Sequence, residues 1–180
     1  MNKLFIDSYN SIISIENLLE AWQEFMQGKR KRKDVQEFER NLMRNILALH
    51  QDLIDKKYQH APYEEFSISD LKPRIIHKAS VRDRLVHHAI YRRVFSYFDK
   101  VFISDSYSCR INKGQYKAIN RFKTFFYKVS KNNHKTCWVL KCDIRKFFAN
   151  IDQEILISIL KERILDKNIM QIYFMNMLCL

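Results

Sequence analysis

One segment of the chain ends an apolar run on an acidic side chain, an arrangement that can serve chemistry. Residues 139–152 read VLKCDIRKFFANID, so the apolar run meets Asp143 and two phenylalanines follow soon after. Residues 138–144 have the clearest strand pattern in the sequence. A carboxylate at the end of a buried strand is costly unless it is paired or binds a cation. We therefore expect Asp143 to be held beside an apolar wall, with a cation as its partner.

Positive charge is concentrated in the middle of the chain. The 180 residues carry a formal net charge of +12, and residues 70–150 hold 19 Lys/Arg against 5 Asp/Glu, with aromatic residues between them. Such a block favours a polyanion partner, because each neutralised phosphate releases counterions. The alternative is a set of solvated helix faces with core aromatics between them. The run KRKRK at residues 29–33 is open to the same two interpretations.

Composition excludes several classes of protein. Only two glycines, Gly28 and Gly114, are present, so neither a Rossmann G-x-G-x-x-G turn nor a phosphate-binding P-loop can be formed. Nucleotide handling would have to use side chains and metal instead. No apolar run is long enough to span a membrane, and an acid at position 7 argues against a signal peptide. Four cysteines without C-x-x-C spacing indicate a reduced, cytoplasmic chain.

Hydrophobic spacing predicts the elements that would position these residues. Helices are expected over residues 11–27, 34–57, 81–98, 116–129 and 152–165, with a last helix beginning at Asp166. Gly28 is expected to end the first helix, and Ser80 with Asp83 forms a capping-box-like pair at the start of the third. Strands are expected at residues 66–68, 74–78 and 138–144, and residues 102–115 form a polar loop. The fold class is therefore α+β and helix-rich.

The segment around Asp143 resembles the first catalytic motif of reverse transcriptases of the group II intron, retron and diversity-generating retroelement type. Their pattern is an apolar strand followed by Asp, Ile, a basic residue, any residue, Phe, Phe, any residue, Asn, Ile and Asp. Three upstream segments agree with the family in order and spacing: residues 72–76 (KPRII), 80–90 (SVRDRLVHHAI) and 105–114 (DSYSCRINKG). In the last of them, Ser108 and Cys109 stand where many relatives have Gly-Phe.

This resemblance implies roles for individual residues in RNA-directed DNA polymerisation. Asp143 is the catalytic acid and, with the backbone carbonyl of Ile144, a metal ligand for two Mg²⁺ ions, with Mn²⁺ as an alternative. Lys72 and Arg74 meet the triphosphate of a deoxynucleoside triphosphate. Phe148 is the gate against a ribose 2′-OH, beside Ile144 in the nucleotide site, whereas Phe147 is expected in the core. The residues expected to contact the RNA template and DNA primer are Arg82, Arg84, Arg110 and Lys113, Arg110 having the alternative role of bracing the loop.

The resemblance also implies a domain plan and an incomplete active site. Residues 1–60 would be a helical basic N-terminal extension, 61–136 a fingers-like region and 137–180 the first part of the palm. No Asp-Asp dipeptide occurs, so the family's Y-x-D-D acid pair is missing. We therefore expect a fingers–palm portion of a right-hand polymerase with a short antiparallel palm sheet, truncated before the second catalytic strand. It would be inactive alone and would either self-associate or need a completing C-terminal portion.

Two other classes compete with this interpretation. A non-catalytic, basic helical nucleic-acid-binding module needs no acid, so a strand ending at Asp143 would discriminate against it. A zinc site is disfavoured, because His87 and His88 are adjacent on a helix and diverge, and no cysteine pair has finger spacing. An anionic membrane partner is not expected, since no helix with one wholly basic face was found in the sequence pattern.

Overall fold

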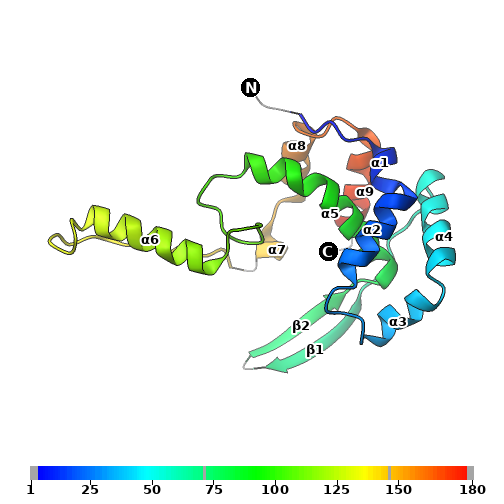
Figure 1. The fold of residues 1–180 in the computed structure, drawn as a ribbon, viewed down its shortest axis with the longest axis horizontal. Helices are drawn as coiled ribbons and strands as arrows, with labels where there is room; N and C mark the ends of the chain where they lie inside the picture. The colour runs from blue at the N-terminus through cyan, green and yellow to red at the C-terminus, as the bar shows by residue number, and fades with distance from the viewer. Residues whose placement is uncertain (1–3, 71, 146, 178–180) are drawn as a thin grey trace. The chain divides into compact units, whose positions relative to one another are not determined.

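Helices dominate the architecture, and the sheet has two antiparallel strands, which confirms the α+β, helix-rich class (Figure 1). The computed structural model describes residues 4–70, 72–145 and 147–177. Within them the elements in chain order are α1 (Tyr9–Ile13), α2 (Ile15–Phe25), α3 (Lys33–Arg40), α4 (Leu42–Ile54), β1 (Glu64–Asp70), β2 (Lys72–Lys78), α5 (Val81–Val101), α6 (Gln115–Val129), α7 (Phe147–Asn150), α8 (Gln153–Lys161) and α9 (Lys167–Met177).

The chain divides into two compact units. The first, here called the helical unit, comprises Met1–Phe95 together with Ile151–Leu180, and the second, here called the basic unit, is Ser96–Asn150. The basic unit holds twelve Lys/Arg against three Asp/Glu, so most of the net charge of the chain lies in it. The three functional segments that the resemblance implies stay a prediction.

The hydrophobic core lies in the helical unit. Trp22 of α2 is buried and its ring lies 5.7 Å from that of Phe25 and 5.1 Å from that of Phe38. The other fully buried side chains come from α1 to α5, from the chain before α9 and from α9 itself, and include Ile12, Leu18, Val35, Ile46, Leu49, Leu53, Leu85, Val86, Ile164 and Ile169. Burial of this apolar surface is the main force that holds the unit together.

The predicted N-terminal helices each form as two shorter helices. Ser14 breaks the first helix, because its hydroxyl caps α2 by accepting a hydrogen bond from the Asn17 N–H at 3.2 Å. Asn41 separates α3 from α4 in the second through its non-helical backbone, without a capping hydrogen bond from its side chain. Helix α2 ends at Phe25, two residues before the expected end, and Gly28 lies in the turn that follows, with φ of +71°, the left-handed conformation that favours glycine.

The starts of α5, α6, α8 and α9 were predicted to within one residue, whereas the short helix α7 was not predicted. Ser80 Oγ accepts a hydrogen bond from the Asp83 N–H at 3.1 Å at the start of α5, as the expected capping pair requires. Asp152 Oδ1 accepts from the Glu154 and Ile155 N–H groups at 3.0 Å and caps α8. Asp166 does the same for α9. Helix α5 ends three residues beyond its expected end, and α8 ends four residues before.

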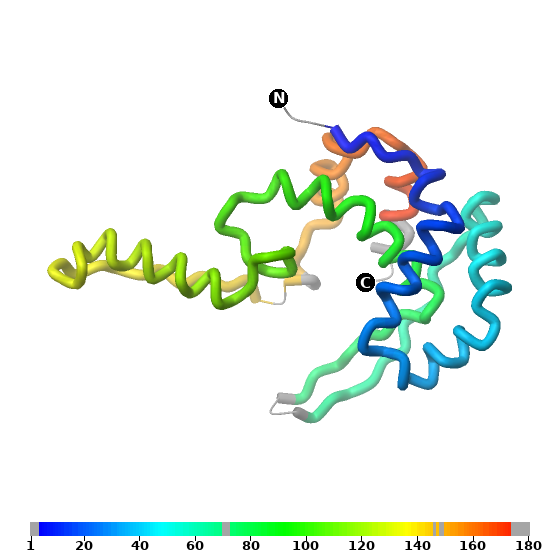
Figure 2. The backbone as a smooth tube through the Cα atoms, in the orientation of Figure 1, coloured from blue at the N-terminus to red at the C-terminus, as the bar shows by residue number. Residues whose placement is uncertain are grey.

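Strands β1 and β2 form a hairpin between α4 and α5, which Figure 2 traces along the backbone. In its antiparallel register Phe66 pairs with Ile76 and Ile68 with Arg74. Directly paired residues share one face, so Phe66, Ile68, Arg74 and Ile76 lie on the same face. The two strands expected at residues 66–68 and 74–78 are confirmed, and both are longer than expected.

The strand expected at residues 138–144 is wrong. These residues have no regular secondary structure, and Trp138 and Leu140 are 94% and 88% exposed. A β-rich sequence becomes a strand only where another strand supplies hydrogen bonds and a packing surface, and no described residue pairs with this segment. The expected short palm sheet is therefore absent from the described part of the chain.

Candidate functional site

The hairpin presents one of the two predicted triphosphate-binding residues to solvent. Arg74 is exposed on β2, and no hydrogen bond or ion pair joins its guanidinium group to another described residue. Lys72 begins β2 two residues earlier, but its side chain lies outside the described part of the structure. An unpaired guanidinium on a strand is free to make a bidentate contact with phosphate.

Asp34 ties the base of the hairpin to two helices. This α3 carboxylate lies 3.1 Å from Lys78 Nζ at the end of β2 and 2.5 Å from Arg84 Nη2 on α5. Burial alone would raise the pKa of Asp34, but the hydrogen bonds from Lys78 and Arg84, with their positive charges, outweigh it and lower the pKa below its ordinary value. Arg84 is thus held by an internal ion pair.

Arg82 and Asp83 also make their contacts within the helical unit. Arg82 Nη2 lies 2.5 Å from Asp52 Oδ2, and its guanidinium carbon lies 5.1 Å from the centre of the Tyr58 ring. Asp83 is buried and accepts hydrogen bonds from Tyr58 OH at 2.8 Å, Ser80 Oγ at 2.6 Å and the Ala61 N–H at 3.2 Å. These contacts give both residues a structural role, and the nucleic-acid contact of Arg82 and Arg84 remains a prediction.

Arg110 braces the loop between α5 and α6. Its guanidinium donates to Asp99 Oδ1 at 2.6 Å and to the carbonyl oxygens of Asp99, Ile103 and Ser106 at 2.8, 2.9 and 3.2 Å. The hydrogen bond from Arg110 lowers the pKa of Asp99 below its ordinary value. Lys113 Nζ donates to the Ser104 carbonyl at 2.6 Å. Of the two roles expected for Arg110, the geometry favours the brace.

Asp143 lies on the exposed segment rather than at the end of a buried strand. Ile144 beside it is 62% exposed, and Phe147 at the start of α7 is 47% exposed, so the expected core position of Phe147 is wrong. The cause is the missing sheet, which would have covered these side chains. The Phe148 side chain, the predicted gate, lies outside the described part.

The residues present do not fit a two-ion magnesium site. No group of three or more His, Cys, Asp or Glu side chains among the described residues could hold a metal ion. Asp143 and the Ile144 carbonyl would supply two oxygens, whereas Mg²⁺ requires near-octahedral coordination. Within the described chain the arrangement offers an exposed, unpaired guanidinium at Arg74, but it lacks the ligands for metal-assisted transfer.

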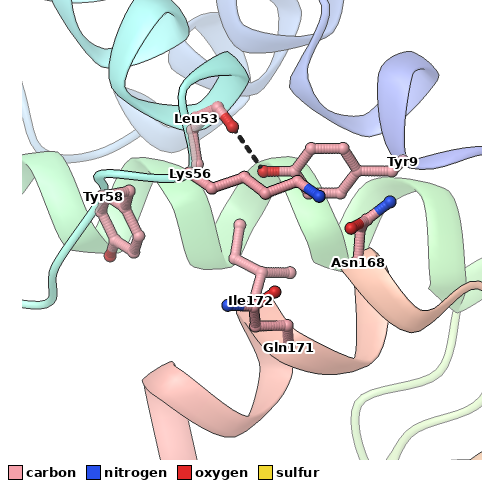
Figure 3. Close-up of a pocket in the computed structure, with 7 residues that line it drawn as sticks. All are labelled: Tyr9, Leu53, Lys56, Tyr58, Asn168, Gln171 and Ile172. Atoms are coloured by element: carbon pink, nitrogen blue, oxygen red, sulfur yellow. Dashed lines mark hydrogen bonds between the residues drawn. The ribbon is translucent and has the colours of Figure 1, made fainter.

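A cavity in the helical unit is too small for a nucleotide (Figure 3). It has a volume of about 20 Å³ and lies beside Tyr9, whose hydroxyl donates to the Leu53 carbonyl at 2.8 Å. A space of this size accommodates one water molecule. It therefore plays no part in the nucleotide site that the resemblance implies.

Sequence reasoning missed a buried polar junction between α2 and α5. Asn17 is fully buried, donates to the Ala89 carbonyl at 3.1 Å and accepts from Arg92 Nη1 at 2.7 Å. Arg92 also donates to Glu20 and Glu24 at 2.8 Å each. The sequence could have indicated that Asn17 is buried, because helical spacing places it four residues before the buried Ala21, on the same helix face. This junction uses an arginine that the charge count had assigned to a polyanion partner.

No protein-family model and no curated protein matches this chain. Among the described helices, none has both the length and the apolar character needed to cross a bilayer.

Proposed function

We propose that the chain binds nucleic acid as the fingers and first palm portion of a reverse transcriptase. The observation that carries the proposal is the hairpin Glu64–Lys78, which has Lys72 and Arg74 on one strand and leads directly into α5. That order of hairpin, helix and Arg110 loop is the one the sequence resemblance implies. RNA template, DNA primer and deoxynucleoside triphosphates are the proposed partners, and the cytoplasm is the proposed location.

The basic unit supports the nucleic-acid part of this proposal. No acidic residue lies between Asp105 and Asp143, while nine Lys/Arg do. A surface with this charge balance attracts phosphate without sequence preference. Because the second acid pair is missing from the sequence and Asp143 lacks metal-binding neighbours, the activity proposed for this chain by itself is binding rather than polymerisation.

A second candidate is a non-catalytic, basic helical nucleic-acid-binding module. The irregular, exposed conformation of residues 138–144 favours it, because a strand ending at Asp143 was the feature that would discriminate against such a module. The two candidates share the nucleic-acid partner and differ in whether the hairpin recognises a triphosphate.

Triphosphate binding separates the two candidates. Isothermal titration of the purified chain with a deoxynucleoside triphosphate should show binding that Arg74→Ala weakens about tenfold or more, since a charge-assisted hydrogen bond contributes roughly 1.5–3 kcal/mol. Arg40→Ala changes an exposed arginine of α3 and is the matched control. Binding that survives Arg74→Ala, or that Arg40→Ala weakens equally, would contradict the hairpin's role. A chain that binds RNA but no triphosphate would favour the second candidate.

A further inference from the structure

Helix α6 carries three kinds of side chain on three separate faces. At 100° per residue, one face is apolar and includes Ile119, Phe122 and Val129. A second face is basic and carries Lys117, Arg121 and Lys128, although the sequence pattern predicted no helix with one wholly basic face. The third reads Tyr116, Asn120, Lys123 and Tyr127, spaced by four, three and four residues, and is here called the tyrosine stripe.

The tyrosine stripe is open to solvent. Tyr116 is 78% exposed and Tyr127 48% exposed, and Asn120 and Lys123 between them are exposed as well. The two tyrosines are eleven residues apart, so their α-carbons are separated by about 16 Å along the helix. A tyrosine ring supplies a flat stacking surface and a hydroxyl that tolerates water.

Some cations of α6 have partners within the chain, and the cation of the tyrosine stripe does not. Arg121 on the basic face donates to Asp105 at 2.9 Å, and Lys117 donates to the Asn112 carbonyl at 2.7 Å. Like Lys128 on the basic face, Lys123 has a side-chain ammonium group with no ion pair or hydrogen bond to any residue that the structure describes. Helix α6 contains no acidic residue, so nothing on it competes with a phosphate for this ammonium group.

We propose that the tyrosine stripe of α6 is a binding surface for single-stranded nucleic acid. Bases stack on Tyr116 and Tyr127, and Lys123 between them neutralises a backbone phosphate. A duplex cannot use the stripe in this way, because its base faces are already stacked on one another. The inference rests on the nucleic-acid partner of the proposed function and adds the strand type and the surface that binds it.

The stripe favours nucleic acid over a lipid surface. A membrane-bound helix inserts its apolar face, with its cations at the edges of that face. The tyrosine stripe adjoins the apolar face of α6, since Lys123 follows Ile119 by four residues, but it combines rings with an amide and an ammonium group. Base stacking requires rings and tolerates such polar neighbours, whereas insertion into a bilayer does not require the tyrosines.

The test is fluorescence anisotropy of the purified chain with a labelled 15-nucleotide oligouridylate and, in parallel, with a labelled 15-base-pair RNA–DNA duplex. The variant Tyr116→Leu/Tyr127→Leu removes both rings but keeps apolar bulk and helix propensity. Tyr116→Phe/Tyr127→Phe keeps the rings. Phe122→Leu/Phe125→Leu is the matched control, because it removes two exposed rings from outside the stripe. Circular dichroism verifies that each variant keeps its helix content.

We expect the leucine pair at the tyrosine positions to weaken oligouridylate binding tenfold or more, with duplex binding changed less than threefold. The phenylalanine pair should bind within twofold of the unchanged chain, as should the Phe122/Phe125 control. Lys123→Gln should make the slope of log affinity against log salt less negative by about 0.7, because one phosphate contact is lost.

Three results would overturn the inference. Oligouridylate affinity that survives removal of both tyrosine rings would do so while leaving the proposed function intact, provided that the duplex still binds with salt dependence. An equal loss in the Phe122/Phe125 control would assign binding to the apolar face. A chain that binds vesicles of phosphatidylserine and phosphatidylcholine but neither nucleic acid would overturn the inference and the proposed function together.

Discussion

Arginine side chains of this chain occupy two kinds of environment. Arg84, Arg92 and Arg110 are fixed by carboxylates or carbonyl oxygens within their own unit, whereas Arg74 has no such partner among the described residues. A guanidinium that is already satisfied must give up its internal contacts before it can bind phosphate. Cations without an internal partner, such as Arg74, are therefore better candidates for phosphate contact than arginines that are already paired.

Asp34→Asn should loosen the base of the hairpin. Loss of the charge that faces Lys78 and Arg84 should lower the free energy of unfolding by about 1–2 kcal/mol at pH 7, since the carboxylate is only partly buried. Because the fold lowers the pKa of Asp34, its stabilisation is present above the unfolded value of about 3.9 and is lost as pH falls through the lower folded value.

Urea unfolding of the unchanged chain and of Asp34→Asn at pH 7 and near pH 3 measures this effect. The difference between the two should shrink at the lower pH. Glu37→Gln, an exposed acid on the same helix, is the control and should be close to neutral. A difference that is independent of pH would show that Asp34 does not stabilise the hairpin through its charge.

Asp83→Ala should be the more damaging substitution. It removes the acceptor for three buried or part-buried donors, on Tyr58, Ser80 and Ala61, and should cost about 3–4 kcal/mol. Tyr58→Phe removes one of these hydrogen bonds and should cost about 1 kcal/mol. Thermal unfolding followed by circular dichroism compares the two. Equal losses would mean that the hydrogen bonds from Ser80 and Ala61 to Asp83 add nothing to stability.

At the scale of elements, short sequence motifs correctly predicted the helix starts and turns that local hydrogen bonds determine. Capping residues located the starts of α5, α8 and α9, and Gly28 located the turn after α2. The breaks at Ser14 and Asn41 were missed, because the apolar stripe continues across both positions. The strand at residues 138–144 was predicted wrongly, because β propensity cannot reveal whether a partner strand is present.

The exposed segment should be the first site of proteolysis. Residues 138–144 lack ladder hydrogen bonds and burial, so chymotrypsin should cleave after Trp138 or Leu140 before it cleaves in α2 or α5. Mass spectrometry of a brief digest identifies the cleavage sites. Earlier cleavage within the core helices would contradict the description of this segment. Phe122 is also an exposed aromatic residue but lies in helix α6, so it serves as the reference for cleavage at an exposed helical site.

At the scale of the whole molecule, most of the net positive charge lies in the basic unit and the hydrophobic core lies in the helical unit. The helical unit pairs many of its cations with its own acids, and the basic unit leaves an acid-free run with exposed aromatics. The sequence revealed the charge block and the candidate residues but not this division of tasks. Ion pairs such as Arg84 with Asp34 join residues fifty positions apart, and their formation depends on tertiary packing that no local pattern encodes.

The most direct test of the account is the salt dependence of nucleic-acid binding by the intact chain. Affinity for a labelled RNA–DNA duplex and for a labelled single strand should be measured between 50 and 300 mM salt. With three or more phosphate contacts from the basic unit, the slope of log affinity against log salt should be about −2 or steeper, with little dependence on base sequence. A flat slope, or no binding at low salt, would contradict the account.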